Sequence, residues 1–194
     1  MSEVSLSETM TSLMNSARKH FEVSSKLTIA NLISLFNPNP NLLTGTKDFS
    51  GSWERIGSWK KEDEKYRGLT VYSKSTAWDG LGQYYDSKPN TTYTFSFYAK
   101  ASKPTDRFMD VFTLPSEDWN SPVIACPIYA NVPLTTDYKR FSWTITTTGG
   151  GKILPSVSST NYDATIYVCG YKLEEGSLPT PLTEADGVEA KTLK

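Results

Sequence analysis

The chain has 194 residues, of which 38% are hydrophobic and 21% are charged, a composition that can bury a core and excludes a wholly disordered protein. Its formal net charge is -1, so it lacks the excess of basic residues with which nucleic-acid-binding proteins neutralise phosphates. Aromatic residues make up 12% of the chain, so candidate rings for ligand binding are plentiful.

The start of the chain and its cysteines bear on its compartment. The opening stretch MSEVSLSETM contains acidic residues and no basic segment followed by an apolar run, so we expect no secretory signal. No window approaches the roughly 20 apolar residues that a membrane-spanning helix needs, so we expect no membrane insertion. Cys126 and Cys169 are far apart in the sequence. Two buried thiols in a reducing compartment and a single disulfide both remain open, whereas two Cys and one His alone cannot complete a tetrahedral metal site.

The first 36 residues predict a helix, a turn and a second, shorter helix, which together we call the headpiece. The helical spacing of three and four is carried by Leu6, Met10, Leu13, Met14, Ala17 and Phe21, and then by Ile29, Leu32, Ile33 and Phe36. Two short amphipathic helices cannot bury both apolar faces fully in each other. We therefore expect the headpiece to dock on the downstream domain or on another chain, in a homo-oligomer or a larger assembly.

A proline-rich segment and then a β domain follow the headpiece. The stretch NPNPN at 37–41 ends the second helix and predicts a semi-rigid linker. From residue 42 onward, short alternating runs replace the helical spacing, most clearly where Tyr93, Phe95 and Phe97 alternate with polar residues. Similar runs lie at 68–75, 107–114, 139–148 and 164–173. They predict a mainly β fold, an antiparallel jelly-roll β-sandwich over 42–182, followed by an exposed C-terminal tail at 183–194.

Three stretches of the β domain together resemble a known family. They are NLLTGTKDFSG at 41–51, KPNTTYTFSFYAKAS at 88–102 and YKLEEGSLPTPL at 171–182. In this order they resemble jelly-roll carbohydrate-binding modules, most of all those on tail and baseplate proteins of phages that infect Gram-positive bacteria. The stretch at 10–36 resembles the short helical headpiece that precedes such modules in those proteins.

The resemblance covers nearly the whole chain and implies a function. It implies a non-catalytic module that binds a host cell-wall or surface polysaccharide, or teichoic acid. It also implies a virion accessory protein, made in the host cytoplasm, with other phage tail or baseplate proteins as partners. A purely structural virion scaffold without sugar binding is the alternative.

A structural calcium occurs in some members of that family, where one acidic residue near the start of the domain and another in the last strand typically bind it. Here Gly170 and Tyr171 stand where an Asp or Asn pair is common, and this departure argues against the site. Asp48 and Asp163 remain as candidate ligands. We otherwise expect no cofactor.

The stretch AWDGLGQYY at 77–85 has the residue types of a saccharide site. A sugar presents a face of C–H groups to a flat ring, and its hydroxyl rim hydrogen-bonds to amides, carboxylates and hydroxyls. We predict Trp78 as the platform, with Asp79 and Gln83 as hydrogen-bonding partners. Tyr84 or Tyr85 supplies a second ring, and we favour Tyr85 as the one that faces outward. The alternative is that Trp78 plugs the end of the sandwich.

Other aromatic residues are open to similar interpretations. Trp119 stands in a predicted loop between Asp118 and Asn120 and is a second candidate platform, or else folds onto the sandwich. Trp53 and Trp59 are six residues apart, so they would share one face of a strand; one is expected in the core, while the pair could bracket a groove. The full set of carbohydrate-binding candidates is therefore Trp53, Trp78, Asp79, Gln83, Tyr85 and Trp119. We expect Trp143 in the core, and Tyr98 either solvated or flooring a groove.

Enzymatic activity finds little support in the sequence. Glycoside hydrolysis needs two carboxylates about 5 to 10 Å apart, and Asp110 within a predicted strand has no partner marked by spacing. His20, the only histidine, belongs to the headpiece, away from any Ser or Cys nucleophile of the β domain. We expect no catalytic residues.

Overall fold

The computed structural model describes residues 6–21, 27–36, 38–115, 132–159 and 163–182. Within these ranges the chain forms two α-helices, a short 3₁₀ helix and ten strands. The helices are α1 (Leu6–Phe21), α2 (Ile29–Phe36) and η1 (Ile56–Ser58). The strands are β1 (Lys60–Tyr66), β2 (Leu69–Lys74), β3 (Trp78–Gly82), β4 (Tyr85–Ser87), β5 (Thr92–Ala101), β6 (Thr105–Pro115), β7 (Val132–Leu134), β8 (Lys139–Thr146), β9 (Gly151–Ser159) and β10 (Ile166–Glu175).

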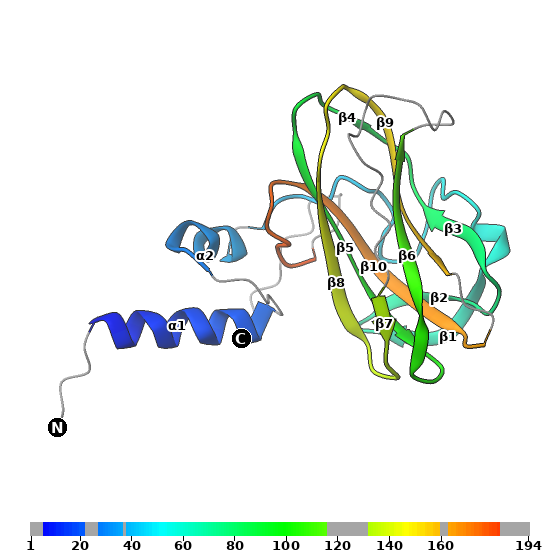
Figure 1. Cartoon of the computed structure of the whole chain (residues 1–194), viewed down its shortest axis with the longest axis horizontal. Helices are drawn as coiled ribbons and strands as arrows, with labels where there is room; N and C mark the ends of the chain where they lie inside the picture. Colours follow the sequence, from blue (N-terminus) through cyan, green and yellow to red (C-terminus); the bar gives the residue numbers. More distant parts are fainter. Residues whose placement is uncertain (1–5, 22–26, 37, 116–131, 160–162, 183–194) are drawn as a thin grey trace.

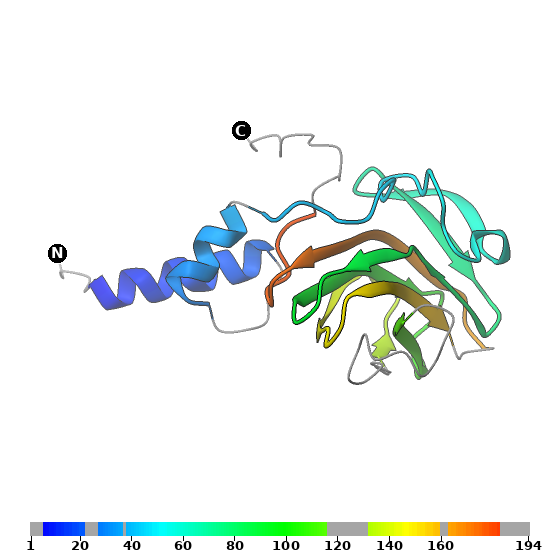
Figure 2. The same ribbon diagram turned by 90° about the horizontal axis from the view of Figure 1, so that it is seen from above.

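Two antiparallel sheets make up the β domain, which confirms the predicted sandwich. One sheet has the order β1-β2-β10-β5-β8, and the other has the order β3-β9-β6-β7 with β4 also paired to β9. Neighbours far apart in the sequence, such as β2 and β10, show the crossovers of a jelly roll. Figure 1 shows the two layers with the helices at one end of the long axis, and Figure 2 shows the arched ribbons of β5 and β10.

The main core lies between the two sheets and is rich in aromatic rings. Tyr93, Phe95 and Phe97 of β5 are fully buried, as their alternation predicts, and they share the core with Ile153 and Val157 of β9. β5 lies between β10 and β8 and is not an edge strand, so its apolar side chains lie between the two sheets.

Tyr171 joins this core through a local irregularity in β10. The pairing of β10 with β5 shifts register between Cys169 and Lys172, and Gly170 has a φ of 61°. A Cβ at Gly170 would lie 2.8 Å from Leu69 Cδ1, so only glycine fits both the backbone and the space. The bulge turns the Tyr171 ring inward, to 5.5 Å from the ring of Phe95.

The outer face of the sheet that contains β2, β10 and β5 carries a second cluster. It contains Leu69, Val71, Tyr98 and Cys169, with Tyr66, Tyr138, Tyr167 and Leu182 packed around them. Tyr98, expected as solvated or as the floor of a groove, is only 6% exposed, because Arg67 donates a hydrogen bond to its hydroxyl and neighbouring rings cover it. Cys169 is a free, buried thiol, and burial raises its pKa to about 12. Cys126 lies outside the described residues.

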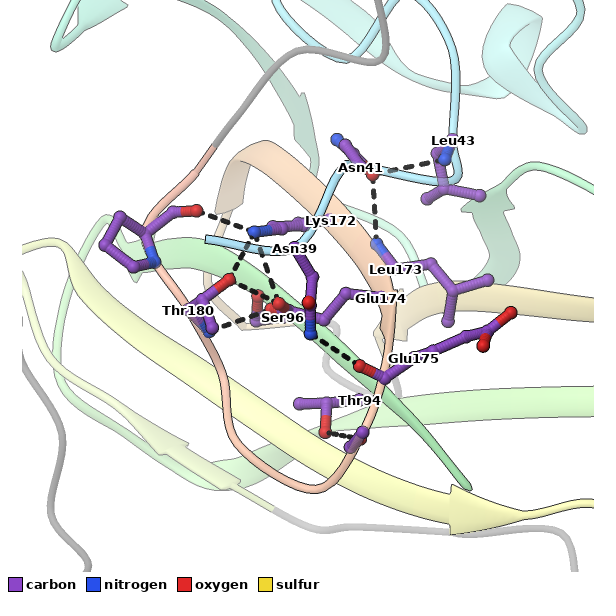
Figure 3. A network of polar contacts seen from close by, with 12 residues as sticks. Asn39, Asn41, Leu43, Thr94, Ser96, Lys172, Leu173, Glu174, Glu175 and Thr180 are labelled. Carbon is purple, nitrogen blue, oxygen red and sulfur yellow. Dashed lines mark hydrogen bonds and ion pairs between the residues drawn. The ribbon is translucent and has the colours of Figure 1, made fainter. Parts of the chain in front are cut away.

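Asn39 and Asn41 of the predicted linker are hydrogen-bonded to β10, as Figure 3 shows. Asn41 is 3% exposed, and its Oδ1 accepts hydrogen bonds from the backbone N–H groups of Leu43 and Leu173. Its Nδ2 donates to the Tyr171 carbonyl. This part of the segment is therefore packed against the sandwich and does not swing free of it.

Beyond β10, residues 176–182 form a strap across the outer face of the sheet that contains β10. Lys172 and Glu174 are fully buried beneath it, with 3.3 Å between Lys172 Nζ and Glu174 Oε2. The Thr180 N–H and hydroxyl both donate to Glu174, and Lys172 Nζ donates to Thr180 Oγ1 and to the Pro181 carbonyl (Figure 3). The strap thus supplies the hydrogen bonds without which two charges could not be buried.

The headpiece helices α1 and α2 occupy the ranges that the spacing predicted. Ala17, Leu27 and Leu32 are buried in a small cluster with Met14, and Leu178 of the strap packs against it. Leu13, Ile29 and Ile33 stay 47%, 60% and 58% exposed. The strap therefore covers part of the apolar surface of the headpiece, while these three remain exposed among its described side chains. None of the helices in the described ranges combines the length and apolar character needed to cross a membrane.

Candidate functional site

Trp78 is the most exposed aromatic side chain among the described residues, at 57%. It begins β3, which pairs on one side with β9 at the edge of the sheet that contains β3, β9, β6 and β7, with β4 also paired to β9. Trp53 and Trp59 are 6% exposed, and Trp143 is partly buried. Since most of its surface faces solvent, Trp78 does not plug the end of the sandwich.

The backbone at Trp78 and Asp79 is held in an uncommon conformation. Their φ angles are 67° and 55°, and the pairing of β3 with β9 shifts register between Trp78 and Leu81. Left-handed backbone costs an L-residue about 1–2 kcal/mol, and Asp tolerates it better than a bulky aromatic residue does. The bulge redirects the side chain at this position, as bulges next to functional sites often do. Trp78 is thus presented to solvent at a cost in free energy.

Asp79 binds protein cations through both carboxylate oxygens. Its Oδ1 lies 2.9 Å from Arg55 Nη1, and its Oδ2 lies 3.5 Å from Lys74 Nζ. The hydrogen bond from Arg55, and to a smaller extent the charge of Lys74, lower the pKa of Asp79. The Trp59 indole N–H donates to the Asp79 carbonyl at 2.7 Å. These contacts fasten the bulge to the segment that precedes β1.

Gln83 does not serve as the predicted ligand partner. It is 9% exposed, its Oε1 accepts a hydrogen bond from the Thr44 N–H, and its Nε2 donates to the carbonyls of Thr44 and Ser52. The sequence prediction was wrong here because the amide is satisfied by loop backbone that no local pattern reveals. Gln83 fastens the loops that precede β1 onto the end of β3.

The prediction that Trp53 binds carbohydrate was also wrong. Its ring lies 4.7 Å from the ring of Phe49 and 5.5 Å from that of Tyr171, and its indole N–H donates to the Ser50 carbonyl. The ring is therefore part of the main core. It is not available to bracket a groove with Trp59, which is buried as well.

Tyr85 faces the core, and the prediction that it faces outward was wrong. It pairs with the buried Ile153 of β9, and its ring lies 5.8 Å from that of Tyr93. Burial raises the pKa of its hydroxyl. The neighbouring Tyr84 has its ring 5.9 Å from Lys152 Nζ. Leu81 of β3 belongs to the same core and Gln83 is buried, so Leu81, Gln83 and Tyr85 do share one face, as predicted, but this face points to the core and not to solvent.

Small side chains lie beside Gly80, two residues along β3 from Trp78, on the outer face of the sheet that contains β3 and β9. Ser156 and Ser158 alternate with the core residue Val157 and therefore face outward. A Cβ on Gly80 would lie 3.2 Å from Ser156 Oγ and 3.5 Å from Ser158 Cβ. Ser158 is 1% exposed, and its hydroxyl has no hydrogen-bond partner among the residues that the structure describes. Sequence reasoning missed these serines, although their alternation with Val157 marked them as outward-facing.

The other predicted residues are Trp119 and the two candidate calcium ligands, Asp48 and Asp163. Trp119 lies outside the described residues. Asp48 is exposed, and its Oδ1 accepts a hydrogen bond from the Ser50 N–H; hydrogen bonds from Ser50 lower its pKa. Asp163 is exposed ahead of β10. Among the residues that the structure describes, no three His, Cys, Asp or Glu side chains gather in a group that could hold a metal ion.

The fold matches solved carbohydrate-binding modules. No family model and no curated protein matches the sequence. The structure TmCBM61 in complex with beta-1,4-galactotriose is 14% identical, with a TM-score of 0.52, and the match covers 70% of this chain and 99% of that one. The CBM22-1 xylan-binding domain of Paenibacillus barcinonensis Xyn10C is 16% identical, with a TM-score of 0.50 and coverage of 73% and 97%. A family 16 carbohydrate-binding module is 22% identical, with a TM-score of 0.49 and coverage of 69% and 99%. At these identities the likeness is one of fold.

Proposed function

We propose that the protein is a non-catalytic carbohydrate-binding module and that Trp78 is its sugar platform. The observation that carries the proposal is the 57% exposure of this indole on a left-handed bulge. Strained backbone persists where surrounding contacts hold it, and such strain clusters at ligand sites. A flat, exposed and rigid ring is what the C–H face of a sugar needs for stacking. The fold neighbours support this choice of ligand class, although a shared fold does not by itself establish function.

The biological role that we propose is host-surface adhesion by a phage tail or baseplate accessory protein in the virion. It rests on the sequence resemblance and gains support from the headpiece, where Leu13, Ile29 and Ile33 leave apolar surface open. We propose that this surface docks on a second copy or on another tail protein. A single stacking site binds weakly, and several copies on one particle would raise the overall affinity by orders of magnitude.

The test is binding of the labelled protein to intact Gram-positive cells, purified wall polysaccharides, xylan and β-1,4-galactan oligosaccharides. We expect Trp78→Ala to weaken binding at least about tenfold, which corresponds to about 1.4 kcal/mol, with the melting temperature retained. Lys88→Ala is the control, because it truncates a side chain that is 63% exposed and that belongs neither to the Trp78 bulge nor to the headpiece surface proposed for docking.

Three outcomes would contradict parts of the proposal. Absence of wild-type binding across the panel would contradict sugar binding and favour a scaffold. Wild-type affinity in Trp78→Ala would move the platform elsewhere, and Trp119→Ala, measured alongside, would test the other candidate indole. A Trp78→Ala variant that only melts early would make the indole structural.

A further inference from the structure

Three residues at this site have left-handed backbone, and an ion pair joins two of them, Arg55 and Asp79. Arg55, Trp78 and Asp79 have φ angles of 56°, 67° and 55°. Glycine, asparagine and aspartate adopt this region readily, whereas arginine and tryptophan seldom do. Contacts from the surrounding structure must therefore hold both Arg55 and Trp78 in place.

The side chain of Asp79 is the point at which these contacts meet. It joins Arg55, which precedes η1, to Lys74 at the end of β2 and to β3, of which it is itself a part. Next to Arg55, the Glu54 N–H donates a hydrogen bond to the carbonyl of Gly82 in β3. Lys74 Nζ also donates to the Ser58 carbonyl at 3.1 Å. Three segments that are separate in the sequence thus converge on one carboxylate.

The two cations differ in burial. The Lys74 side chain is 4% exposed, whereas that of Arg55 is 62% exposed. A buried ammonium needs a neutralising partner, and Asp79 supplies it. The exposed pair with Arg55 is weaker, because solvent screens it. Lys74 therefore fixes where the carboxylate lies, and Arg55 holds it from the solvent side.

We propose that Asp79 is a positioning residue for Trp78. Its carboxylate, engaged by Arg55 and Lys74, locks the left-handed bulge and so fixes the orientation of the indole. In this role the carboxylate acts on the sugar through the indole, whereas the sequence predicted a direct hydrogen bond to the sugar, and the saccharide readout below distinguishes the two roles. The consequence for sugar affinity rests on the proposed function, whereas the consequence for the indole does not.

The test compares Asp79→Asn and Arg55→Gln in the full chain. Asparagine tolerates left-handed backbone as aspartate does, so the first variant removes the charge and keeps the backbone preference. The second removes only the exposed cation and leaves the carboxylate with Lys74. Lys88→Gln is the matched control, because it breaks an exposed ion pair, with Glu175, that does not involve Asp79.

The first readout is the ¹⁹F spectrum of protein labelled with 5-fluorotryptophan, in which Trp78→Phe identifies the Trp78 resonance among those of five tryptophans. We expect this resonance to shift or broaden in Asp79→Asn, to change less in Arg55→Gln and to stay unchanged in Lys88→Gln. An unchanged resonance in folded Asp79→Asn would overturn the proposal. If Asp79→Asn does not fold, because Lys74 is left buried without its partner, an unchanged resonance in Arg55→Gln would overturn it.

The second readout is saccharide affinity, and Arg55→Gln separates the two roles of Asp79. If Asp79 positions Trp78, this variant binds saccharide about fivefold or more weakly, a change of roughly 1 kcal/mol. If Asp79 instead hydrogen-bonds the sugar, freeing its Oδ1 leaves the affinity unchanged or raises it, and the proposal falls. Should the wild type bind no saccharide, the proposed function fails, and the Trp78 resonance alone decides whether Asp79 positions the indole.

Discussion

Substitution of Asn41 by alanine tests whether the NPNPN segment is a linker or belongs to the sandwich. The Asn41 Nδ2 donates to the Tyr171 carbonyl at 2.9 Å and to Thr46 Oγ1 at 3.0 Å. Its Oδ1 accepts from the N–H groups of Leu43 and Leu173, both at 3.1 Å. The side chain is 3% exposed, so water does not readily replace these bonds.

The expected loss of stability follows from these four hydrogen bonds. Each contributes about 1 kcal/mol net, and a buried partner left unsatisfied costs about 1–3 kcal/mol. Leu173 is fully buried, so its N–H would be left without a partner. We expect Asn41→Ala to lower the free energy of unfolding by about 4 kcal/mol, a large share of the roughly 5–15 kcal/mol that stabilises a typical domain.

The assay is urea unfolding followed by tryptophan fluorescence. Asn39→Ala is the control: Asn39 is half-buried and donates to the Glu175 carbonyl at 2.7 Å, and its loss should cost about 1 kcal/mol. If Asn41→Ala remains within about 1 kcal/mol of the wild type, the net worth of a single hydrogen bond, the segment is a linker that the sandwich does not need.

Four further predictions follow from buried groups and from the candidate metal ligands. Burial lowers the pKa of Lys172 from 10.5 to about 8. Between these two pKa values the unfolded state binds more protons than the folded state, so this residue makes the free energy of unfolding rise with pH. Urea unfolding at pH 7.5 and 10 should therefore show a smaller rise for Lys172→Met than for the wild type. The Tyr171 hydroxyl is buried and has no hydrogen-bond partner among the described residues, so Tyr171→Phe should leave the free energy of unfolding unchanged or raise it. Tyr98→Phe, in contrast, loses the hydrogen bond from Arg67 and should lower the free energy of unfolding by about 1 kcal/mol. The buried Cys169 thiol, with its raised pKa, should react with a thiol reagent only after unfolding, and mass mapping of a labelled native sample that shows modified Cys169 would contradict this. Because Asp48 and Asp163 belong to no cluster of metal ligands among the described residues, EGTA should leave the melting temperature unchanged, and a drop that added calcium reverses would revive the calcium site.

Regular periodicity made much of the fold predictable. The helical spacing of Leu13, Ala17, Leu32 and their neighbours places α1 and α2 within the predicted ranges. The alternation of Tyr93, Phe95 and Phe97 identifies the core face of β5. Such patterns work because one side of a helix or strand meets apolar surroundings along its whole length, so the preference repeats in the sequence.

The candidate site could be predicted only in part. The sequence singled out Trp78 as an indole among small and polar residues, but it could not distinguish its exposure from the burial of Trp53, which also stands beside glycine and serine. Local composition is similar at the two positions. What differs is a distant partner, since the Tyr171 ring packs on Trp53 and the bulge at the edge strand turns Trp78 to solvent.

The helical headpiece, the β-sandwich and the core face of its most regular strand could be predicted from the residues alone, because these features depend on short-range periodicity. Three-dimensional packing sets the inward direction of Tyr85, the hydrogen bonds of Gln83 to loop backbone and of Asn41 to β10, and the contacts of Asp79 with Arg55 and Lys74. Each of these depends on a contact between residues far apart in the sequence, and such contacts form only when separate segments meet in the folded protein.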